Sequence, residues 1–334
     1  MQSLRDLFAF FSVPLFIWWC TSIVVTFALG FLFSTTLLPS LASSTQKEQI
    51  SAEHRESGYV FINPLLECEY NNNQGNIKLK ALKDEVEKVV SSKADQDISL
   101  YYRDLLNGPW YGYDENETFS PQSLLKLPII LAYFKIADEN PNILNEEIEY
   151  KEILDSNLPV SYSLELGKRY TVDSLIQRTI QQSDNVAFTL LVDHLPLKFV
   201  EKVHDDLNIP YPKEGTPTDF ISVRSYSSIF RVLYNASYLS RRNSEYLLEL
   251  LSKSDFPDGL VAGVPKSVPV SHKFGIKNPS EEHPESQLHD CGVVYHPDHP
   301  YLLCIMTKAN NQNEQIKTIE ELSNTVYKVI SSEE

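Results

Sequence analysis

The stretch Phe119–Ala132 constrains this chain more than any other, because it joins a helix start to an almost wholly apolar sequence. Ser120 followed by Pro121 predicts a helix N-terminus, with the serine hydroxyl as the cap and the proline where no backbone donor is needed. After Ser123 the side chains are apolar nearly all round: Leu124, Leu125, Leu127, Ile129, Ile130 and Leu131. A helix without a polar face is normally buried, so we expect this one in the interior.

Lys126 is the one charged residue of this stretch, and it follows Ser123 by one helical turn on the same side. A buried ammonium is costly, and a lysine whose pKa is lowered can act as a base toward a neighbouring serine. The S-x-x-K spacing therefore indicates a serine nucleophile with a lysine base. The alternative is a capping serine beside a lysine that extends to solvent. Spacing alone does not choose, because Ser44 and Lys47 have it too.

The overall charge excludes one class of function. The 334 residues carry a formal net charge of −16, and no basic patch stands out. Such a chain cannot neutralise phosphates, so we expect no nucleic-acid partner. The length suits one large domain or two modest ones.

An uncharged segment near the N-terminus predicts a membrane anchor. No charged residue occurs between Leu7 and Gln46, and Val13–Leu38 would form a helix about 39 Å long, enough to cross a hydrocarbon core of about 30 Å. The alternative is a cleaved signal peptide with its cleavage site near Ala42, but its apolar region would be much shorter. We expect residues 1–45 to form an anchor and tether, and residues 46–76 a lead-in to the domain; the charges on the two sides of the segment do not decide its orientation.

The order of the remaining elements predicts an α+β fold. Hydrophobic periodicity indicates helices and strands in this order: helix Ile77–Ala94, strands Ile98–Arg103 and Trp110–Tyr113, helices within Tyr170–Leu195 (interrupted near Ser183), Val223–Tyr234 and Asn243–Leu251, strands Val270–Phe274, Gly292–Tyr295 and Tyr301–Met306, and helix Gln315–Ile330. We expect a five-stranded antiparallel sheet flanked by its terminal helices, with an all-α lobe at about 120–258 inserted after the second strand. The catalytic domain would then span 77–334, with Ser123 at the seam between lobes.

Two further motifs accompany the serine and the lysine. Ser183-Asp184-Asn185 interrupts a helical stretch, and Lys273-Phe274-Gly275 lies on a predicted strand. Taken singly, each has an ordinary explanation, a turn in the first case and an exposed strand lysine in the second. In the order S-x-x-K, S-D-N, K-x-G, however, they resemble the active-site serine penicillin-recognising family, and most closely its class A β-lactamases. The lead-in sequences Gly167–Leu175 and Leu260–Ser267 are also similar to the family's, and the resemblance covers about Ile77–Ile330.

This resemblance implies a role for each motif residue. Ser123 would be the acylated nucleophile, Lys126 would take its proton, and Ser183 would relay a proton to the leaving nitrogen. Asn185 would orient Lys126 and the substrate amide, and Lys273 would supply positive charge near a substrate carboxylate. The residue after Gly275 is Ile276, and its backbone N–H would form an oxyanion hole with that of Ser123. We expect Asp184 to brace its loop.

The chain departs from the family at two positions. Phe274 stands where the family has threonine or serine, whose hydroxyl helps to bind the substrate carboxylate. The family's Glu-x-x-Leu-Asn loop, which activates the deacylating water, has no counterpart in Asp205–Ser222. Glu214 and Asp219 are the only acids there after Asp205 and Asp206. We therefore expect acylation without efficient deacylation.

Cysteine and histidine placement suggests no metal or cofactor. Cys68, Cys291 and Cys304 allow at most one disulfide, and Cys291 and Cys304 are either cross-strand partners or buried free thiols. His283, His289, His296 and His299 crowd one region with Asp290, but hairpin histidines are more commonly solvated than metal-bound. The aromatic residues near Tyr101 and Trp110 are expected to be sheet residues and no sugar-binding platform.

These expectations combine into one function with two alternatives. We expect a membrane-anchored serine acyl-hydrolase, outside the cytoplasm in the periplasm or at the cell surface, that acts on a β-lactam or a related amide. A D,D-carboxypeptidase or other peptidase acting on peptidoglycan peptides is one alternative. The other is a domain that binds such ligands without turning them over.

Overall fold

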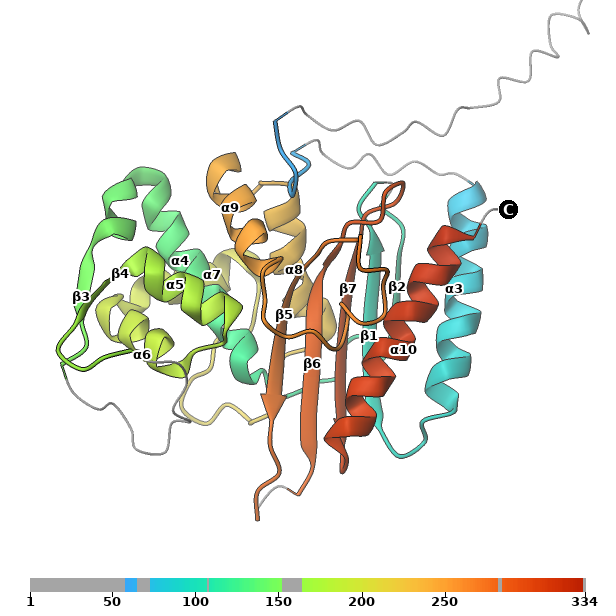
Figure 1. Ribbon diagram of the computed structural model, residues 1–334. Helices are drawn as coiled ribbons and strands as arrows, with labels where there is room; N and C mark the ends of the chain where they lie inside the picture. Colours follow the sequence, from blue (N-terminus) through green and yellow to red (C-terminus); the bar gives the residue numbers. More distant parts are fainter. Residues whose placement is uncertain (1–57, 65–72, 107, 152–163, 282–283, 333–334) are drawn as a thin grey trace, which may run out of the picture. The chain divides into compact units, whose positions relative to one another are not determined.

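The computed structural model describes residues 58–64, 73–106, 108–151, 164–281 and 284–332 (Figure 1). All of them belong to one unit of the chain, Glu53–Glu334. The expected anchor, Val13–Leu38, lies outside the described residues. Within the described ranges, no helix has the length and apolarity that a membrane crossing requires.

A five-stranded antiparallel sheet organises the described chain, in the spatial order β2-β1-β7-β6-β5. Its strands are β1 (Asp97–Asp104), β2 (Trp110–Tyr113), β5 (Val270–Lys277), β6 (Ser286–Val294) and β7 (Tyr301–Ala309). Every residue of β6 is buried, because helices cover both faces of the sheet. The predicted five-stranded sheet is confirmed, and β5 is the edge strand nearest the helical lobe (Figure 1).

The two terminal helices cover one face of the sheet. Helices α3 (Asn73–Ser91) and α10 (Gln312–Ser331) pack against each other, and α10 packs on β6 and β7. Apolar residues at helical spacing meet those of the strands in one buried cluster, which includes Leu82, Val86, Leu100, Leu288, Ile305, Ile319, Leu322 and Val326. This layer arises as the sequence periodicity predicts.

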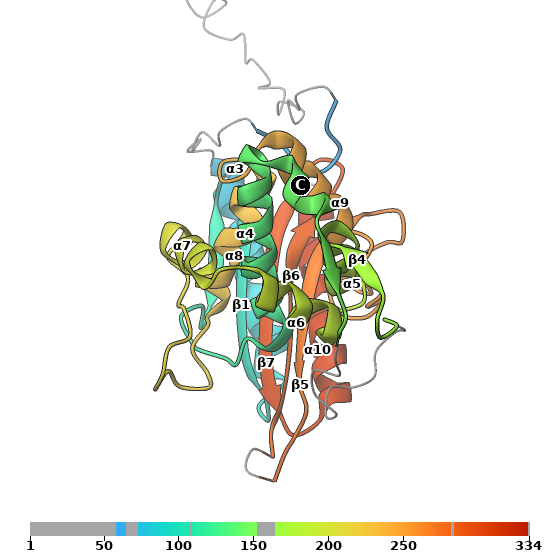
Figure 2. The same cartoon turned by 90° about the vertical axis from the view of Figure 1, so that its left-hand side faces the viewer.

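A helical lobe covers the other face and extends beyond the edge at β5 (Figures 1 and 2). It contains η1 (Gln122–Leu125), α4 (Lys126–Glu139), η2 (Pro141–Asn145), α5 (Val172–Gln181), α6 (Asn185–His194), α7 (Leu197–Leu207), α8 (Val223–Tyr234) and α9 (Arg241–Leu251). Helix α8 packs on β6 and β7. The lobe and this face of the sheet share one core, to which α4 contributes Leu127 and Phe134 and β7 contributes Leu302 and Met306.

The sequence predicted an all-helical lobe, and this prediction is wrong in one part. Strands β3 (Glu147–Glu149) and β4 (Arg169–Thr171) pair as a small antiparallel sheet. Arg169 donates a hydrogen bond to Glu147 across this pair. Three-residue strands are too short to show a period of two, so the pattern does not predict them. Helix α7 was also not predicted.

The start of the serine helix also differs from the prediction. The first turn, η1, is a 3-10 helix, and the α-helix begins only at Lys126. Ser120 does not cap it: its hydroxyl accepts a hydrogen bond from the side-chain amide of Gln122. Gln122 has a φ of +48°, in the left-handed region that most residues avoid. Ser123 is thus presented by a tight turn before α4 rather than by the helix itself.

Residues 58–64 pack on the helical lobe. The carboxylate of Glu245 on α9 accepts hydrogen bonds from three successive backbone N–H groups, those of Val60, Phe61 and Ile62, at 2.6–3.1 Å. Ile62 is fully buried, and the Tyr295 hydroxyl donates to the carbonyl of Phe61. This segment is therefore part of the folded unit.

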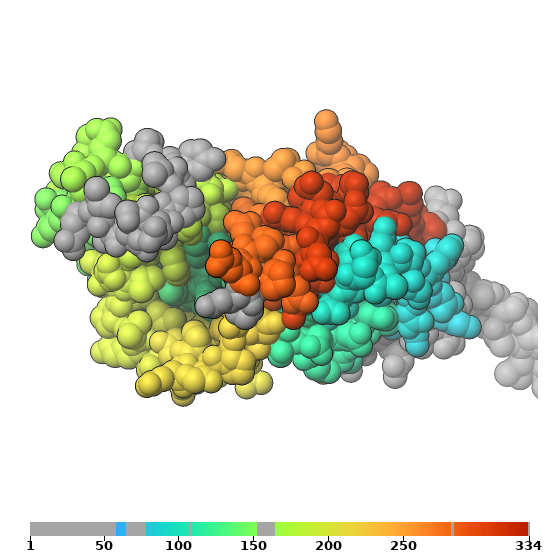
Figure 3. All heavy atoms as spheres, turned by 90° about the horizontal axis from the view of Figure 1, so that it is seen from below, coloured from blue at the N-terminus to red at the C-terminus, as the bar shows by residue number. Residues whose placement is uncertain are grey.

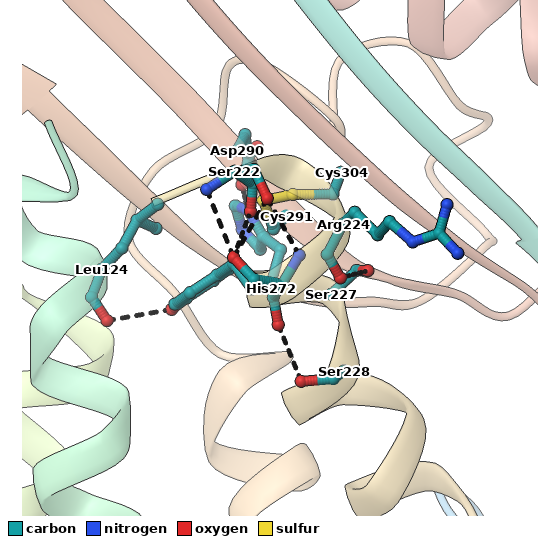
Figure 4. The surroundings of a disulfide bond; sticks show 11 residues. Leu124, Ser222, Arg224, Ser227, Ser228, His272, Asp290, Cys291 and Cys304 are labelled. Atoms are coloured by element: carbon teal, nitrogen blue, oxygen red, sulfur yellow. Dashed lines mark hydrogen bonds and ion pairs between the residues drawn. A yellow bond between two sulfur atoms is a disulfide. The ribbon is translucent and has the colours of Figure 1, made fainter. Parts of the chain in front are cut away.

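Cys291 and Cys304 form a disulfide between neighbouring strands (Figure 4). They lie directly opposite each other on β6 and β7, and both are fully buried. Of the two possibilities that the sequence left open, the structure shows the cross-strand pair. On the other side of β6, Cys291 is the register partner of Lys273.

Candidate active site

Three side chains hold the turn that presents Ser123. The side-chain oxygen of Gln287 accepts from the backbone N–H of Ser120 at 2.9 Å, and the Nε2 of His289 donates to the carbonyl of Ser120 at 2.9 Å. The Tyr226 hydroxyl donates to the carbonyl of Leu124 at 3.0 Å. Burial lowers the pKa of His289 to about 4, so its ring stays neutral and keeps its proton on Nε2. The turn is fixed on both sides of the serine.

Gly275 allows strand β5 to lie against this turn. A Cβ atom at this position would come within 3.0 Å of the carbonyl oxygen of Pro121 and 3.2 Å of the Leu124 side chain. Any larger residue would push the strand away. Ile276, expected to supply an oxyanion-hole donor, follows directly in β5 and is partly buried. Seen from below, the green and yellow atoms of the helical lobe lie beside the orange atoms of strands β5 and β6 (Figure 3).

Ser123 itself is partly exposed. Among the interactions of the described residues, its hydroxyl takes part in no hydrogen bond. Partial exposure and a hydroxyl without a hydrogen bond in the described ranges suit the nucleophile role that the motif suggests for Ser123.

Lys126 is buried, with 3% of its surface exposed, so it does not extend to solvent. Its ammonium donates to the carbonyl oxygen of Ser183 at 2.5 Å, to the Ser183 hydroxyl at 3.1 Å and to Oδ1 of Asn185 at 2.6 Å. Burial lowers the pKa of Lys126 to about 8, although the Asp184 carboxylate opposes the shift. A usable fraction of neutral amine is therefore present near neutral pH.

The Ser183-Asp184-Asn185 motif forms the break between α5 and α6. Ser183 has a φ of +54°, which turns the chain sharply. The Asp184 carboxylate caps α6 by accepting from the N–H groups of Val186 and Ala187 at 2.8 and 3.1 Å. Asp184 thus braces the loop, as expected, while its neighbours Ser183 and Asn185 both contact Lys126.

Lys273 enters the same cluster from the sheet. It is fully buried on β5, and its ammonium donates to the Ser183 hydroxyl at 3.2 Å and to the carbonyl of Phe274 at 3.0 Å. Burial, and next the charge of Lys126, lower the pKa of Lys273 to about 7. Two lysines from distant parts of the chain therefore share one hydroxyl group as acceptor.

The structure shows the surroundings of both departures from the family pattern, Phe274 and the loop that lacks the family's glutamate. The Phe274 ring stacks on Phe256, with centroids 4.2 Å apart. Of the two acids considered as a base, Glu214 is exposed on its loop, and Asp219 accepts from the side chains of Gln287 and Lys308. Neither has a contact with Ser123, Lys126 or Ser183 among the interactions of the described residues.

The residues that support the turn belong to no motif and were not predicted. The sequence suggested at most a metal-ligand role for His289, whereas in the structure its ring hydrogen bonds the carbonyl of Ser120. Gln287 and His289 alternate on β6 and so point to one face, which was the available signal. His296 instead hydrogen bonds Ser331 near the C-terminal helix. In the ranges that the structure describes, no three histidine, cysteine or acidic side chains are grouped as a metal site would need.

Comparisons with known proteins agree with this fold. PBP-A superposes with a TM-score of 0.65 at 22% identity, over 75% of this chain and 96% of that one. A class A beta-lactamase from Bacteroides cellulosilyticus DSM 14838 gives a TM-score of 0.68 at 17% identity, over 77% and 99% of the two chains. A beta-lactamase from Sphaerobacter thermophilus DSM 20745 gives 0.64 at 18%, over 76% and 99%. These likenesses show a shared fold.

No curated protein matches the sequence. The model of the beta-lactamase enzyme family, in contrast, matches residues 81–330, which include all three motifs and every strand of the main sheet. The chain belongs to the beta-lactamase enzyme family.

Proposed function

We propose that this protein is a serine acyl-hydrolase in which Ser123 is acylated by β-lactams or related amides and the acyl group leaves slowly. We further propose that Val13–Leu38 anchors it in a membrane, with the catalytic domain outside the cytoplasm. The observation that carries the proposal is the shared contact at Ser183. Its hydroxyl lies 3.1 Å from the Lys126 ammonium and 3.2 Å from that of Lys273, and the partly exposed Ser123 stands three residues before Lys126.

Acylation follows from these groups in two steps. Neutral Lys126 takes the proton of Ser123 as its Oγ bonds to the carbonyl carbon of the substrate, and the backbone N–H groups of Ser123 and Ile276 stabilise the resulting oxyanion. When the intermediate collapses, the carbon–nitrogen bond breaks. The leaving nitrogen receives the hydroxyl proton of Ser183, which is replaced from the Lys126 ammonium. Lys126 thereby returns to its neutral form.

Deacylation needs a second base, which would take a proton from water. Glu214 is exposed and Asp219 is bonded to Gln287 and Lys308, so neither supports this step. The positions of these two acids therefore favour a long-lived acyl-enzyme over rapid turnover of β-lactams. A peptidase acting on peptidoglycan peptides is the second candidate, since deacylation of a peptidyl acyl-enzyme need not use the same water as deacylation of a β-lactam adduct.

Two observations support the location and the ligand class. A buried disulfide such as Cys291–Cys304 persists in oxidising compartments and is rare in the cytosol. A variant of the structurally similar PBP-A is described as an acyl-enzyme complex with penicillin G, which makes a penicillin a suitable probe for this chain.

A fluorescent penicillin tests the proposal. The domain should acquire a covalent label that survives denaturing electrophoresis, and Ser123→Ala should not. After excess unlabelled penicillin is added, the label should be lost slowly, and Glu214→Gln should lose it at the wild-type rate. Absence of any label would refute acylation. Rapid loss that depends on Glu214 or Asp219 would refute the slow-deacylation part alone.

A further inference from the structure

Lys273 differs from a lysine that is exposed and free to bind a substrate anion. Its side chain is 0% exposed, and two of its three ammonium protons are donated within the chain, to the Ser183 hydroxyl and the Phe274 carbonyl. The ammonium nitrogen also lies 4.2 Å from the centroid of the Phe274 ring. That distance is typical of a cation–π contact, in which the ring face takes the place of an anion.

The Phe274 ring is itself held in place. Phe256 stacks on it with centroids 4.2 Å apart and an angle of 18° between the rings. Because Phe256 occupies one face of the ring, the ammonium lies over the other face. Both phenylalanines are partly exposed, so they form an apolar surface at the free edge of β5, next to the lysine cluster. We call Phe256 and Phe274 the aromatic pair.

The geometry points to a substrate that carries an uncharged group, rather than a carboxylate, where it meets the aromatic pair. This inference rests on the proposed acylation of Ser123 and names the substrate class for that site. A carboxylate there would have to displace the ring from the ammonium, and the phenyl group offers it no hydrogen-bond donor. It would also lose water against an apolar surface, which is unfavourable for a charged group. An ester, an amide or an apolar substituent meets neither cost. Phe274 is then the specificity-determining residue.

A matched pair of probes tests this inference. Penicillin G and its methyl ester differ only in whether the carboxylate is free, and intact-protein mass spectrometry gives the rate constant of acylation by each. We expect the wild type to react with the ester at least as fast as with the acid. Phe274→Thr supplies a hydroxyl donor and uncovers the ammonium, so it should shift the acid-to-ester ratio toward the acid by about tenfold or more, as expected for a hydrogen bond to a charged group.

Two controls keep the result interpretable. Phe274→Leu stays apolar and adds no hydroxyl donor, so it should shift the ratio less than Phe274→Thr does. Phe256→Leu keeps the Phe274 ring over the ammonium and should keep the wild-type preference. The wild-type ratio decides the question even if a variant fails to fold. A wild type that reacts at least tenfold faster with the acid would overturn the inference while leaving acylation at Ser123 intact. If neither probe acylates Ser123, the proposed function falls and the inference falls with it.

Discussion

The ammonium nitrogen of Lys126 lies 2.6 Å from Oδ1 of Asn185. A neutral amide accepts this hydrogen bond without adding charge, so the low pKa of Lys126, about 8, is preserved. Asn185→Asp would place a carboxylate beside the ammonium and raise its pKa. Since the proposed acylation requires the neutral amine, the rise of the acylation rate with pH should move to higher pH by at least about one unit.

Acylation rates from pH 6 to 10 measure this shift. Because Lys126 and Lys273 contact the same hydroxyl, the profile reports apparent values for the pair. Asn310 is exposed and lies after β7, so Asn310→Asp adds the same charge away from the site and should leave the profile unchanged. A profile for Asn185→Asp that coincides with that of the wild type would contradict the assignment of Lys126 as the base.

The buried lysine should also make stability depend on pH. Folding lowers the pKa of Lys126 from its usual 10.5 to about 8. Below pH 8 the folded state holds a desolvated ammonium; between pH 8 and 10.5 the folded state releases the proton that the unfolded state still binds. The free energy of unfolding should therefore rise over this range by up to about 3 kcal/mol from Lys126 alone.

Lys126→Met removes this contribution, so urea unfolding of both proteins at several pH values isolates it. The wild-type advantage over Lys126→Met should grow between pH 8 and 10.5. Lys88 is exposed on α3, and the wild-type advantage over Lys88→Met should stay flat. A flat difference for Lys126→Met as well would mean that the lysine is not desolvated in the folded protein.

Most of the fold could be predicted because its signals are local. Periodicity predicted the five strands of the main sheet and the terminal helices, although only the last part of β6 (Ser286–Val294) was predicted, as Gly292–Tyr295. For α8 the predicted bounds agree with the structure. The start of the serine helix could not be predicted, because tertiary contacts override the capping pattern. Gln287 and His289 hold both backbone groups of Ser120, and its hydroxyl accepts from Gln122 instead. A capping side chain contributes about 1 kcal/mol to stability, and the two hydrogen bonds to the Ser120 backbone together contribute more than that.

The candidate site also contains residues that the sequence could predict and residues that it could not. Ser123, Lys126, Ser183, Asn185 and Lys273 belong to short motifs, so the sequence could nominate them. The structure brings the last four into one hydrogen-bonded cluster. The supporting residues Tyr226, Gln287 and His289 have no motif. Each acts on a backbone group more than 100 positions away, and only the folded chain brings them there.

The contact between Glu245 and residues 60–62 should stabilise the domain. Glu245→Ala removes the acceptor of three backbone N–H groups, and we expect it to lower the free energy of unfolding by about 1.5–3 kcal/mol, the range for hydrogen bonds to a charged group. Hydrogen exchange of the amides of Val60, Phe61 and Ile62 should become faster. Glu249→Ala, which removes a partly exposed carboxylate from the same helix, should change neither measurement. Unchanged exchange in Glu245→Ala would show that the segment is held by its apolar packing alone.

The disulfide gives a fourth prediction. It closes a short loop, since Cys291 and Cys304 are 13 positions apart, and crosslinks of this span contribute about 3 kcal/mol. Denaturant unfolding with and without reductant should show that loss for the wild type. For the double variant Cys291→Ala/Cys304→Ala, the free energy of unfolding should be the same with and without reductant. Equal stability of oxidised and reduced wild type would mean that the crosslink adds nothing to the packing of the two strands.

The central claim is that the acyl group bonds to Ser123, and peptide mapping of the penicillin G adduct tests it most directly. The protein is incubated with the probe, quenched in acid, digested and analysed by tandem mass spectrometry. The account predicts one adduct, on the peptide that contains Ser123, which is absent from Ser123→Ala and forms more slowly in Ser183→Ala. No adduct at all, or an adduct on any other residue that persists in Ser123→Ala, would contradict it.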